Sequence, residues 1–198
     1  MVRSSLPASY FEQKYKDDID PWRFRTSDYE RKKYDATIGA LTKVRYRHGL
    51  EVGCSIGVLT ALLSERCERL LAIDASPTAI AEARHNGPAR VEFRVAAIPE
   101  EFPAGSFDLI ILSEVMYYFS VRDLSRVAEL CLSRLAPEGE IILCHWLGPT
   151  NYPLTGHQAS DLFAVAAATR LPSRTILHDA IYRLERLSAR AFDASGAG

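Results

Sequence analysis

The sequence lacks the features that mark several classes of protein. Its 198 residues include four cysteines, Cys54, Cys67, Cys131 and Cys144, and none has the spacing of a disulfide scaffold or a metal site. The 24 basic residues balance 25 acidic ones, so a nucleic-acid partner is not expected. No apolar run approaches the roughly 20 residues that span a membrane, and the first 18 residues contain no apolar stretch, so we expect no secretory signal. We expect a metal-free cytoplasmic protein.

Strand-like and helix-like segments alternate through most of the chain, which predicts a doubly wound α/β fold with a mostly parallel sheet. The expected strands are residues 47–52, 69–73, 90–95, 107–112 and 140–146. Three of them are apolar on both faces, as parallel strands covered by helices on both sides usually are. The expected helices are residues 27–43, 57–66, 76–84, 120–135 and 161–169. Residues 174–178 and 181–187 are the last apolar segments, and the period does not decide whether 181–187 is a strand or a helix.

The first 45 residues lie outside this alternation and are rich in aromatic side chains. Ser27, followed three positions later by Glu30, has the pattern of a helix start. We expect residues 1–45 to form a helical lid over a Rossmann-like core at residues 46–190. The length of the chain predicts that both parts belong to a single domain, residues 1–198.

The most informative segment is the turn after the first expected strand. Gly53, Ser55 and Gly57 lie in this turn, Glu51 lies just before it, and Asp74 ends the next strand. Ligands of open parallel sheets bind at the carboxyl ends of the strands, and an acid about 20 residues after the turn is the usual partner of ribose hydroxyls. The Glu51 carboxylate would repel a diphosphate. The pattern favours a nucleoside that carries an ammonium group and no phosphate, such as S-adenosylmethionine.

Four motifs in order resemble those of class I S-adenosylmethionine-dependent methyltransferases, over roughly residues 47–146. They are LEVGCSIG (50–57), LLAIDAS (70–76), FDLIILSEVMYY (107–118) and LAPEGEIIL (135–143). The resemblance implies a seven-stranded, mostly parallel sheet, S-adenosylmethionine as methyl donor and S-adenosylhomocysteine as product.

Three further segments resemble the nodulation protein S group of methyltransferases, with similarity over about residues 9–188. They are DPWRF (20–24), SDYERKKY (27–34) and HWLGPTNYPLTG (145–156). The resemblance implies N-methylation of the free amine of a glucosamine unit on a chitooligosaccharide, a step in making rhizobial signalling molecules. The expected partner is therefore a small-molecule or oligosaccharide acceptor. The oligomeric state is left open, and a monomer is compatible with the sequence.

The expected cofactor-binding residues come from the lid, the turn and the ends of the strands. They are Trp22, Tyr29, Arg31, Glu51, Gly53, Ser55, Gly57, Asp74, Ala75, Ala97, Ile98, Ser113 and Tyr118. Ser55 replaces the middle glycine of the family motif. Ala97 stands where the family commonly has an acid, so the backbone amides of Ala97 and Ile98 are expected to read the adenine. Arg31 or Lys33 is a candidate partner of the cofactor carboxylate.

The expected catalytic residues follow the fourth and fifth strands. His145 is the candidate general base, and Glu114 and Tyr117 are candidates to orient the acceptor. Trp146 and Tyr152 are candidate contacts for a sugar ring.

Three other functions remain open at this point. One is O- or N-methylation of another small metabolite, and another is cofactor binding without catalysis. The third is a serine hydrolase, because Gly53-x-Ser55-x-Gly57 also matches a nucleophile elbow. Only about fifty residues precede Ser55 and no HGGG-type loop is present, which disfavours the hydrolase.

Overall fold

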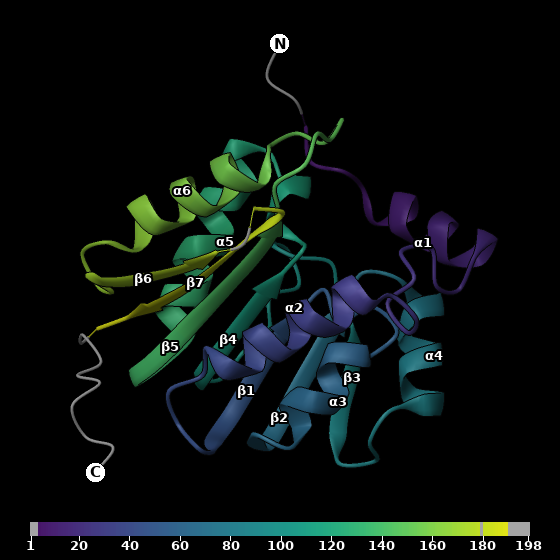
Figure 1. Cartoon of the computed structure of the whole chain (residues 1–198), viewed down its shortest axis with the longest axis horizontal. Coiled ribbons are helices and arrows are strands. Elements are labelled where there is room, and N and C mark those ends of the chain that lie inside the picture. Colours follow the sequence, from purple (N-terminus) through teal and green to yellow (C-terminus); the bar gives the residue numbers. More distant parts are fainter. Residues whose placement is uncertain (1–3, 179, 190–198) are drawn as a thin grey trace.

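The computed structural model describes residues 4–178 and 180–189, and it contains a seven-stranded sheet between two layers of helices (Figure 1). The strand order is β3-β2-β1-β4-β5-β7-β6. The strands are β1 (Tyr46–Val52), β2 (Cys67–Asp74), β3 (Val91–Val95), β4 (Phe107–Ser113), β5 (Leu135–Trp146), β6 (Ser173–His178) and β7 (Tyr182–Ser188). The helices are α1 (Ala8–Asp17), α2 (Asp28–Gly39), α3 (Val58–Ser64), α4 (Pro77–Asn86), the 3-10 helix η1 (Met116–Tyr118), α5 (Val121–Arg134) and α6 (Gly156–Ala167). The predicted α/β fold with a mostly parallel sheet is confirmed.

Side chains of the predicted type begin three of the helices. The hydroxyls of Ser27, Ser76 and Ser120 each accept the backbone N–H three residues later, as N-caps do. The helix expected at 27–43 ends at Gly39. The helix expected at 161–169 begins at Gly156, because Thr155 and Gln158 form a capping box that starts it earlier.

The apolar segment 181–187, whose type the period left open, lies largely in strand β7, and the apolar segment 174–178 lies in β6. Strand β7 pairs antiparallel with both β5 and β6, so they complete the sheet at one edge. This pairing involves residues distant in sequence, which local periodicity does not reveal. Residue 190, the expected end of the core, lies outside the described residues.

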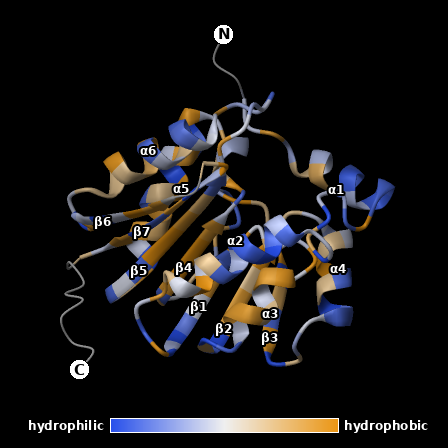
Figure 2. Ribbon diagram, viewed as in Figure 1, coloured by the Kyte–Doolittle hydropathy of each residue, from blue (hydrophilic) through white to orange (hydrophobic). Residues whose placement is uncertain are grey.

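Apolar side chains on the two faces of the sheet form separate cores. On one face, Leu112 and Ile141 pack with side chains of α5 and α6, and on the other, Leu109 and Ile111 pack with those of α2, α3 and α4. Figure 2 shows the central strands as the most hydrophobic part of the ribbon. Each fully buried Leu or Ile contributes roughly 1.5–3 kcal/mol of transfer free energy, so the two cores stabilise the sheet on which the site is built.

The direction of the strands determines where the site lies. Val52 of β1 is in register with Ile73 of β2 and Leu112 of β4, so these parallel strands end at the same edge. The strand order reverses between β1 and β4, where ligands of such sheets usually bind.

The N-terminal segment crosses this edge. The Leu6 amide donates to the Tyr118 carbonyl at 2.9 Å, and the Glu12 side chain of α1 binds the first turn of α4. Within residues 4–178 and 180–189, no helix has both the length and the apolar character needed to cross a membrane.

Candidate functional site

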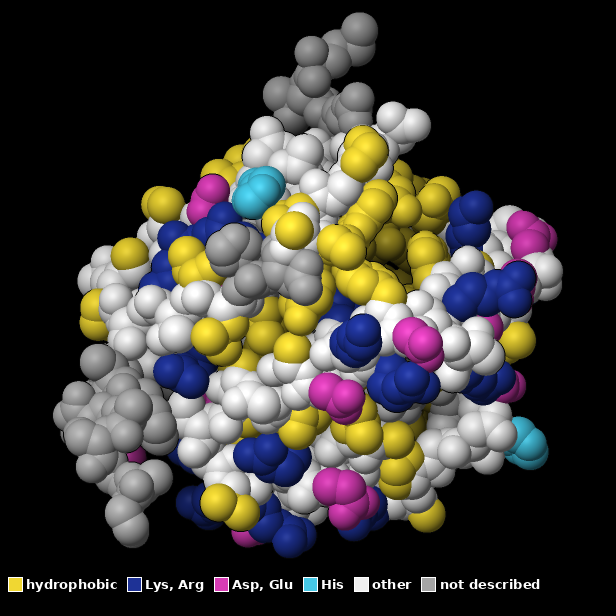
Figure 3. All heavy atoms as spheres, viewed as in Figure 1, with side chains coloured by type: hydrophobic (Ala, Val, Ile, Leu, Met, Phe, Trp, Pro, Cys, Tyr) yellow, Lys and Arg dark blue, Asp and Glu magenta, His cyan; other side chains and the backbone are white. Residues whose placement is uncertain are grey.

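A cavity of about 370 Å³ opens at the carboxyl ends of β1, β2 and β4. Residues of α1, α2 and the loop between them form its outer wall, and the strand ends form its floor. Figure 3 shows the opening as a hollow surrounded by hydrophobic side chains, on the side of α1. The volume lies within the usual 300–1,000 Å³ of small-molecule sites.

The turn between β1 and α3 has an unusual backbone. Gly53, Ser55 and Gly57 all have positive φ, of 75°, 53° and 84°. A left-handed conformation costs a non-glycine residue roughly 1 kcal/mol, and Ser55 adopts it with its Oγ bound by the Tyr15 hydroxyl at 2.6 Å. The turn therefore presents its backbone to the cavity, and α1 is fastened to it.

Two buried carboxylates lie beside this turn. Asp74 ends β2, and its two oxygens accept the backbone amides of Ser55 and Ser76, each at 2.9 Å. Burial raises the pKa of Asp74. Each carboxylate oxygen has two lone pairs, so Asp74 has acceptor capacity left for a ligand's hydroxyls.

Glu51 is 2% exposed, and its Oε2 has no hydrogen-bond partner. Burial raises the pKa of the Glu51 carboxyl to about 8. A buried carboxylate without a partner is costly, so this oxygen is suited to a cationic donor that enters the cavity. Glu51 and Asp74 therefore form a polar end of the cavity that fits a nucleoside with an ammonium group.

A second cluster of charged groups lies at the end of β4. Glu114, with φ of 56°, directs its carboxylate to the Lys33 ammonium, and Oε1 lies 2.6 Å from Nζ. The other oxygen, Oε2, accepts the Tyr117 hydroxyl at 2.6 Å and the Trp146 amide at 3.0 Å. Burial acts to raise the pKa of Glu114, but Lys33 and the other groups that face the carboxylate together outweigh burial, and the pKa lies below its usual value. Glu114 is therefore ionised at neutral pH.

Aromatic rings surround this cluster. The rings of Tyr117 and Tyr152 are stacked with centroids 5.3 Å apart, and Tyr118 meets both of them edge to face. Phe11 of α1 packs edge to face on Tyr118. The cavity thus has a polar end at β1 and β2, formed by Glu51 and Asp74, and an aromatic end at η1.

Most of the predicted site residues line this one cavity. They are Trp22, Tyr29, Glu51, Gly53, Ser55, Asp74, Ala75, Ala97, Ile98, Ser113, Glu114, Tyr117, Tyr118, Trp146 and Tyr152. The structure therefore brings together residues from the lid and from both halves of the sheet.

The structure does not place His145, the predicted general base, at the cavity. His145 is fully buried and does not line the cavity. Its Nε2 lies 3.3 Å from the Met116 amide, which can only donate, so Nδ1 carries the hydrogen and faces the Ser160 hydroxyl at 3.3 Å. Burial lowers the pKa of the ring to about 4. The imidazole is neutral and braces η1 against α6.

Two other predicted positions do not reach the cavity. The Arg31 side chain is 69% exposed and pairs with Asp28 on the outer face of α2. Gly57 is the N-cap of α3, and a Cβ atom there would lie 3.3 Å from that of Ala83. Gly57 therefore permits close packing and is not part of the cavity wall. The Ala97 amide, expected to read the adenine, donates to the Glu101 carboxylate at 2.7 Å, although Ala97 itself lines the cavity.

Sequence reasoning missed Tyr15 and Glu30, and it gave Lys33 a different role. The SDYERKKY segment contains the relevant signal, because Glu30 and Lys33 are three residues apart on one face of a helix. Nothing local indicates that this face points to β4. The contact between Tyr15 and Ser55 spans 40 residues and depends on the tertiary fold.

The geometry also bears on the serine hydrolase alternative. A serine nucleophile needs a base within hydrogen-bond reach, and the partner of Ser55 Oγ is the Tyr15 hydroxyl. None of the described residues that line the cavity is a histidine.

In the described part of the chain, no group of His, Cys, Asp and Glu side chains is arranged to hold a metal ion.

Comparison with known protein families identifies the chain. The sequence model of the family described as "Nodulation protein S (NodS)" matches residues 9–146, more than half of the chain. The chain belongs to the nodulation protein S family. It is 33% identical over 127 residues to the nodulation protein S of Rhizobium tropici, an alignment that spans 62% of this chain and 53% of that relative. The chain thus covers about half the length of this curated relative.

Solved structures show the same fold. A protein from Pseudomonas syringae with a provisional methyltransferase assignment is 34% identical, with a TM-score of 0.70 over 81% of this chain and 98% of that one. The N-methyltransferase NodS of Bradyrhizobium japonicum WM9, solved with S-adenosyl-L-homocysteine, has a TM-score of 0.75 at 22% identity. That match covers 89% of this chain and 97% of the other.

Proposed function

We propose that this member of the nodulation protein S family is an S-adenosylmethionine-dependent N-methyltransferase. The observation that carries the proposal is the charge of the cavity. Its lining among the described residues contains four acids, Glu30, Glu51, Asp74 and Glu114, and one cation, Lys33, which is already bound by two of the acids. A phosphate-bearing cofactor would find no available cation there, whereas the ammonium group of a sulfonium cofactor meets acids that can ionise as it binds.

The residues at the polar end suit the parts of this cofactor. Glu51 would bind the ammonium through its unpaired oxygen. Asp74, held by two backbone amides, would accept the ribose hydroxyls. Trp22 and Tyr29 of the lid, with Ile98 and Tyr118, would enclose the rest and exclude water. The bound cofactor supplies a methyl group that is already activated on sulfur.

The remaining task of the protein is to align a neutral amine with that methyl group. Because the cofactor carries the activation, positioning accounts for most of the catalysis. Glu114 and Tyr117 are hydrogen-bonded to each other at the aromatic end, where the acceptor nitrogen would lie. The neutral, buried His145 serves only to support η1.

We propose that the acceptor amine belongs to a de-N-acetylated glucosamine unit of a chitooligosaccharide, as in nodulation factor synthesis. Family membership supports this substrate class. The rings of Trp146, Tyr117 and Tyr152 offer flat apolar faces on which a sugar ring can stack. The cavity volume is near the lower end of the usual range, so only the terminal sugar would enter beside the cofactor.

The small cavity also favours a second candidate, N- or O-methylation of another small metabolite. The discriminating experiment offers methyl-labelled S-adenosylmethionine with glucosamine oligomers of increasing length, and separately with small amines and alcohols. Transfer to the terminal amine of the oligomers supports the oligosaccharide, and transfer only to small molecules supports the second candidate. If calorimetry detects neither S-adenosylmethionine nor S-adenosylhomocysteine binding, the proposed activity is wrong.

A further inference from the structure

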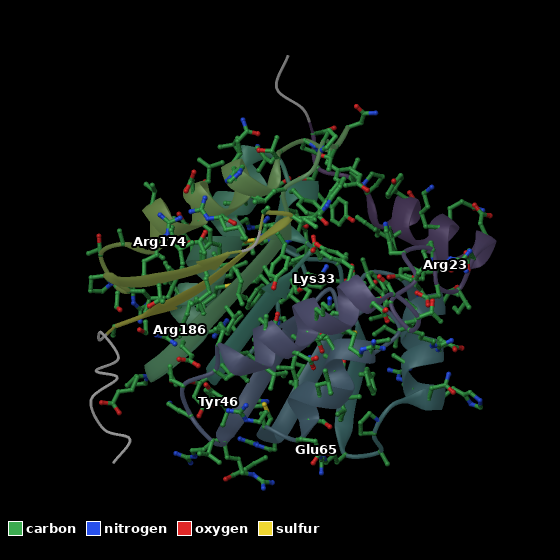
Figure 4. All side chains as sticks on the ribbon, in the orientation of Figure 1. Arg23, Lys33, Tyr46, Glu65, Arg174 and Arg186 are labelled. Carbon is green, nitrogen blue, oxygen red and sulfur yellow. The ribbon has the colours of Figure 1, made fainter. Side chains whose placement is uncertain are left out.

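Lys33 is a buried cation at the cavity wall. It is 1% exposed, and its ammonium lies between two carboxylates, 2.9 Å from Glu30 and 2.6 Å from Glu114. The ring of Tyr29 is 5.0 Å from the same nitrogen. Figure 4 shows Lys33 near the centre of the molecule, whereas Arg23 and Arg174 lie at its periphery. Burial acts to lower the pKa of Lys33, but Glu114 and Glu30 outweigh it and raise the pKa above its usual value.

A group of buried charges such as this one contributes little net free energy to the stability of the fold. Removing ions from water costs several kcal/mol each, and apolar residues of similar size often replace buried ion pairs without loss. Lys33, Glu30 and Glu114 all line the cavity. Buried charges that persist in a cavity wall despite this cost are candidate functional groups that act on a bound ligand.

Both oxygens of the Glu114 carboxylate have hydrogen-bond donors. Lys33 occupies Oε1, and the Tyr117 hydroxyl and Trp146 amide occupy Oε2. A carboxylate held by an ammonium and two further donors is a poor proton acceptor. Its effect is on Tyr117, because the phenolic hydrogen is directed to Oε2, and Oη, which also neighbours the Tyr118 hydroxyl, keeps a lone pair as an acceptor.

We propose that Lys33 is a positioning residue for the methyl acceptor: it fixes Glu114, which orients the Tyr117 hydroxyl to accept a hydrogen bond from the N–H of a primary or secondary amine. This inference rests on the proposed N-methyltransferase function. The hydrogen bond turns the nitrogen lone pair toward the methyl group. An acceptor nitrogen without hydrogen cannot make this bond, so tertiary amines are excluded.

The chemical step balances without a protein base. The nitrogen lone pair forms the new N–C bond, the C–S bond breaks, and its electron pair stays on sulfur as a thioether. The nitrogen then carries a positive charge and loses its proton to water. Tyr117 stays protonated, since burial raises the pKa of its hydroxyl well above the usual value.

The charge on Glu114 depends on every group that faces it. These are Lys33, Glu30, Tyr29 and Tyr34 from α2, Tyr117 and Tyr118 from η1, Cys144 and His145 from β5, and Tyr152 from the loop after β5. Lys33 is the only cation among them at neutral pH, because His145 is neutral there. Removing Lys33 therefore raises the pKa of Glu114, and a protonated Glu114 no longer fixes the Tyr117 hydrogen.

The test compares Lys33→Met with Lys32→Met, which removes an exposed lysine from the same helix. We expect Lys33→Met to lower kcat by about 100-fold, in the range of other losses of positioning and proton-orienting groups. The acid limb of its kcat–pH profile should move to higher pH, while the dissociation constant for S-adenosylmethionine changes less than about threefold. Lys33→Arg should restore part of kcat and return the pH profile toward that of the wild type. Lys32→Met should match the wild type throughout.

Two further measurements keep the test decisive if Lys33→Met does not fold. Tyr117→Phe removes no charge and should lose kcat with the cofactor affinity intact. Mass spectrometry of exhaustive wild-type reactions should detect mono- and dimethylated amine but no trimethylated product. Wild-type kcat and pH profile in a folded Lys33→Met, wild-type activity in Tyr117→Phe, or a trimethylated product overturns the inference. Failure of the proposed function is distinct, since the wild type would then methylate no amine at all.

Discussion

The hydroxyl of Tyr15 donates to Oγ of Ser55 at 2.6 Å, and this bond fastens the N-terminal helix to the turn at the base of the cavity. Both side chains are buried. Ser55 has a left-handed backbone in a position where the family motif has glycine, so a strained residue has gained a specific partner. The lid and the turn are therefore coupled by one hydrogen bond.

This coupling predicts different effects for two substitutions of Ser55. Ser55→Ala keeps the backbone strain and leaves the Tyr15 hydroxyl buried without an acceptor, which costs about 1–3 kcal/mol. Ser55→Gly loses the same bond but relieves the strain, so it should be more stable than Ser55→Ala by about 1 kcal/mol. Urea denaturation of both variants measures the difference. Equal stabilities would show that the left-handed backbone at Ser55 carries no strain.

Asp74→Ala should weaken binding of S-adenosylmethionine by about 10- to 100-fold, because hydrogen bonds to a charged group contribute roughly 1.5–3 kcal/mol. Isothermal calorimetry measures the affinity. Asp108→Asn is a matched control, since Asp108 also accepts two backbone amides, from Arg47 and His48, near the opposite ends of the strands. An unchanged affinity in Asp74→Ala would mean that the ribose lies elsewhere.

The affinity for S-adenosylmethionine should rise with pH up to about 8. In the free protein the pKa of Glu51 is about 8, so this carboxyl is mostly protonated at pH 7. A bound ammonium favours the ionised form, and binding at pH 7 therefore releases a proton. Calorimetry in two buffers of different ionisation enthalpy detects that proton. Glu51→Gln should abolish the release from this group, whereas Glu92→Gln, at an exposed position on β3, should not.

Glu51 should also make the unliganded protein less stable as pH rises. Its pKa increases from an ordinary 4.5 to about 8 on folding, so the folded state holds the proton more tightly than the unfolded state. The free energy of unfolding should fall between about pH 4.5 and pH 8 as a result. Denaturation curves of wild type and Glu51→Gln across this interval test the sign. A slope that is the same in both proteins would contradict the buried, unpaired state of Glu51.

Docking of α1 should be sensitive to acid through Glu12. Its carboxylate accepts the Ser76 hydroxyl at 2.7 Å, and the amide and hydroxyl of Thr78 at 3.1 and 2.8 Å. These bonds lower its pKa to about 2, the hydrogen bond from Ser76 having the largest effect. The stabilisation is present above pH 4.5 and is lost as pH falls toward 2.

Glu12→Gln should mimic this loss at neutral pH and cost about 1 kcal/mol, the usual effect of losing a helix cap. Hydrogen exchange of the α1 amides measures the docking directly. Asp17→Asn on the same helix is the control, because Asp17 bonds only within α1. Faster exchange in both variants, or in neither, would contradict a specific role of Glu12.

The parts of the fold that short-range rules govern could be predicted from the sequence. The caps at Ser27, Ser76 and Ser120 satisfy the first amides of their own helices, and the apolar strands must be covered on both sides. The placement of Glu51 and Asp74 at one edge also follows, because parallel strands end together. These features depend on neighbouring residues and on strand direction, both of which the chain order contains.

The tertiary structure alone decided which groups meet inside the cavity. His145 and Trp146 are adjacent in sequence, yet one lies under η1 and the other lines the cavity, because successive residues of a strand face opposite sides of the sheet. Arg31 and Lys33 are two residues apart on one helix, and the packing of α2 on the sheet sends the first to solvent and the second between two carboxylates. Such choices depend on how helix and sheet faces fit together over long sequence distances, which the local pattern does not specify.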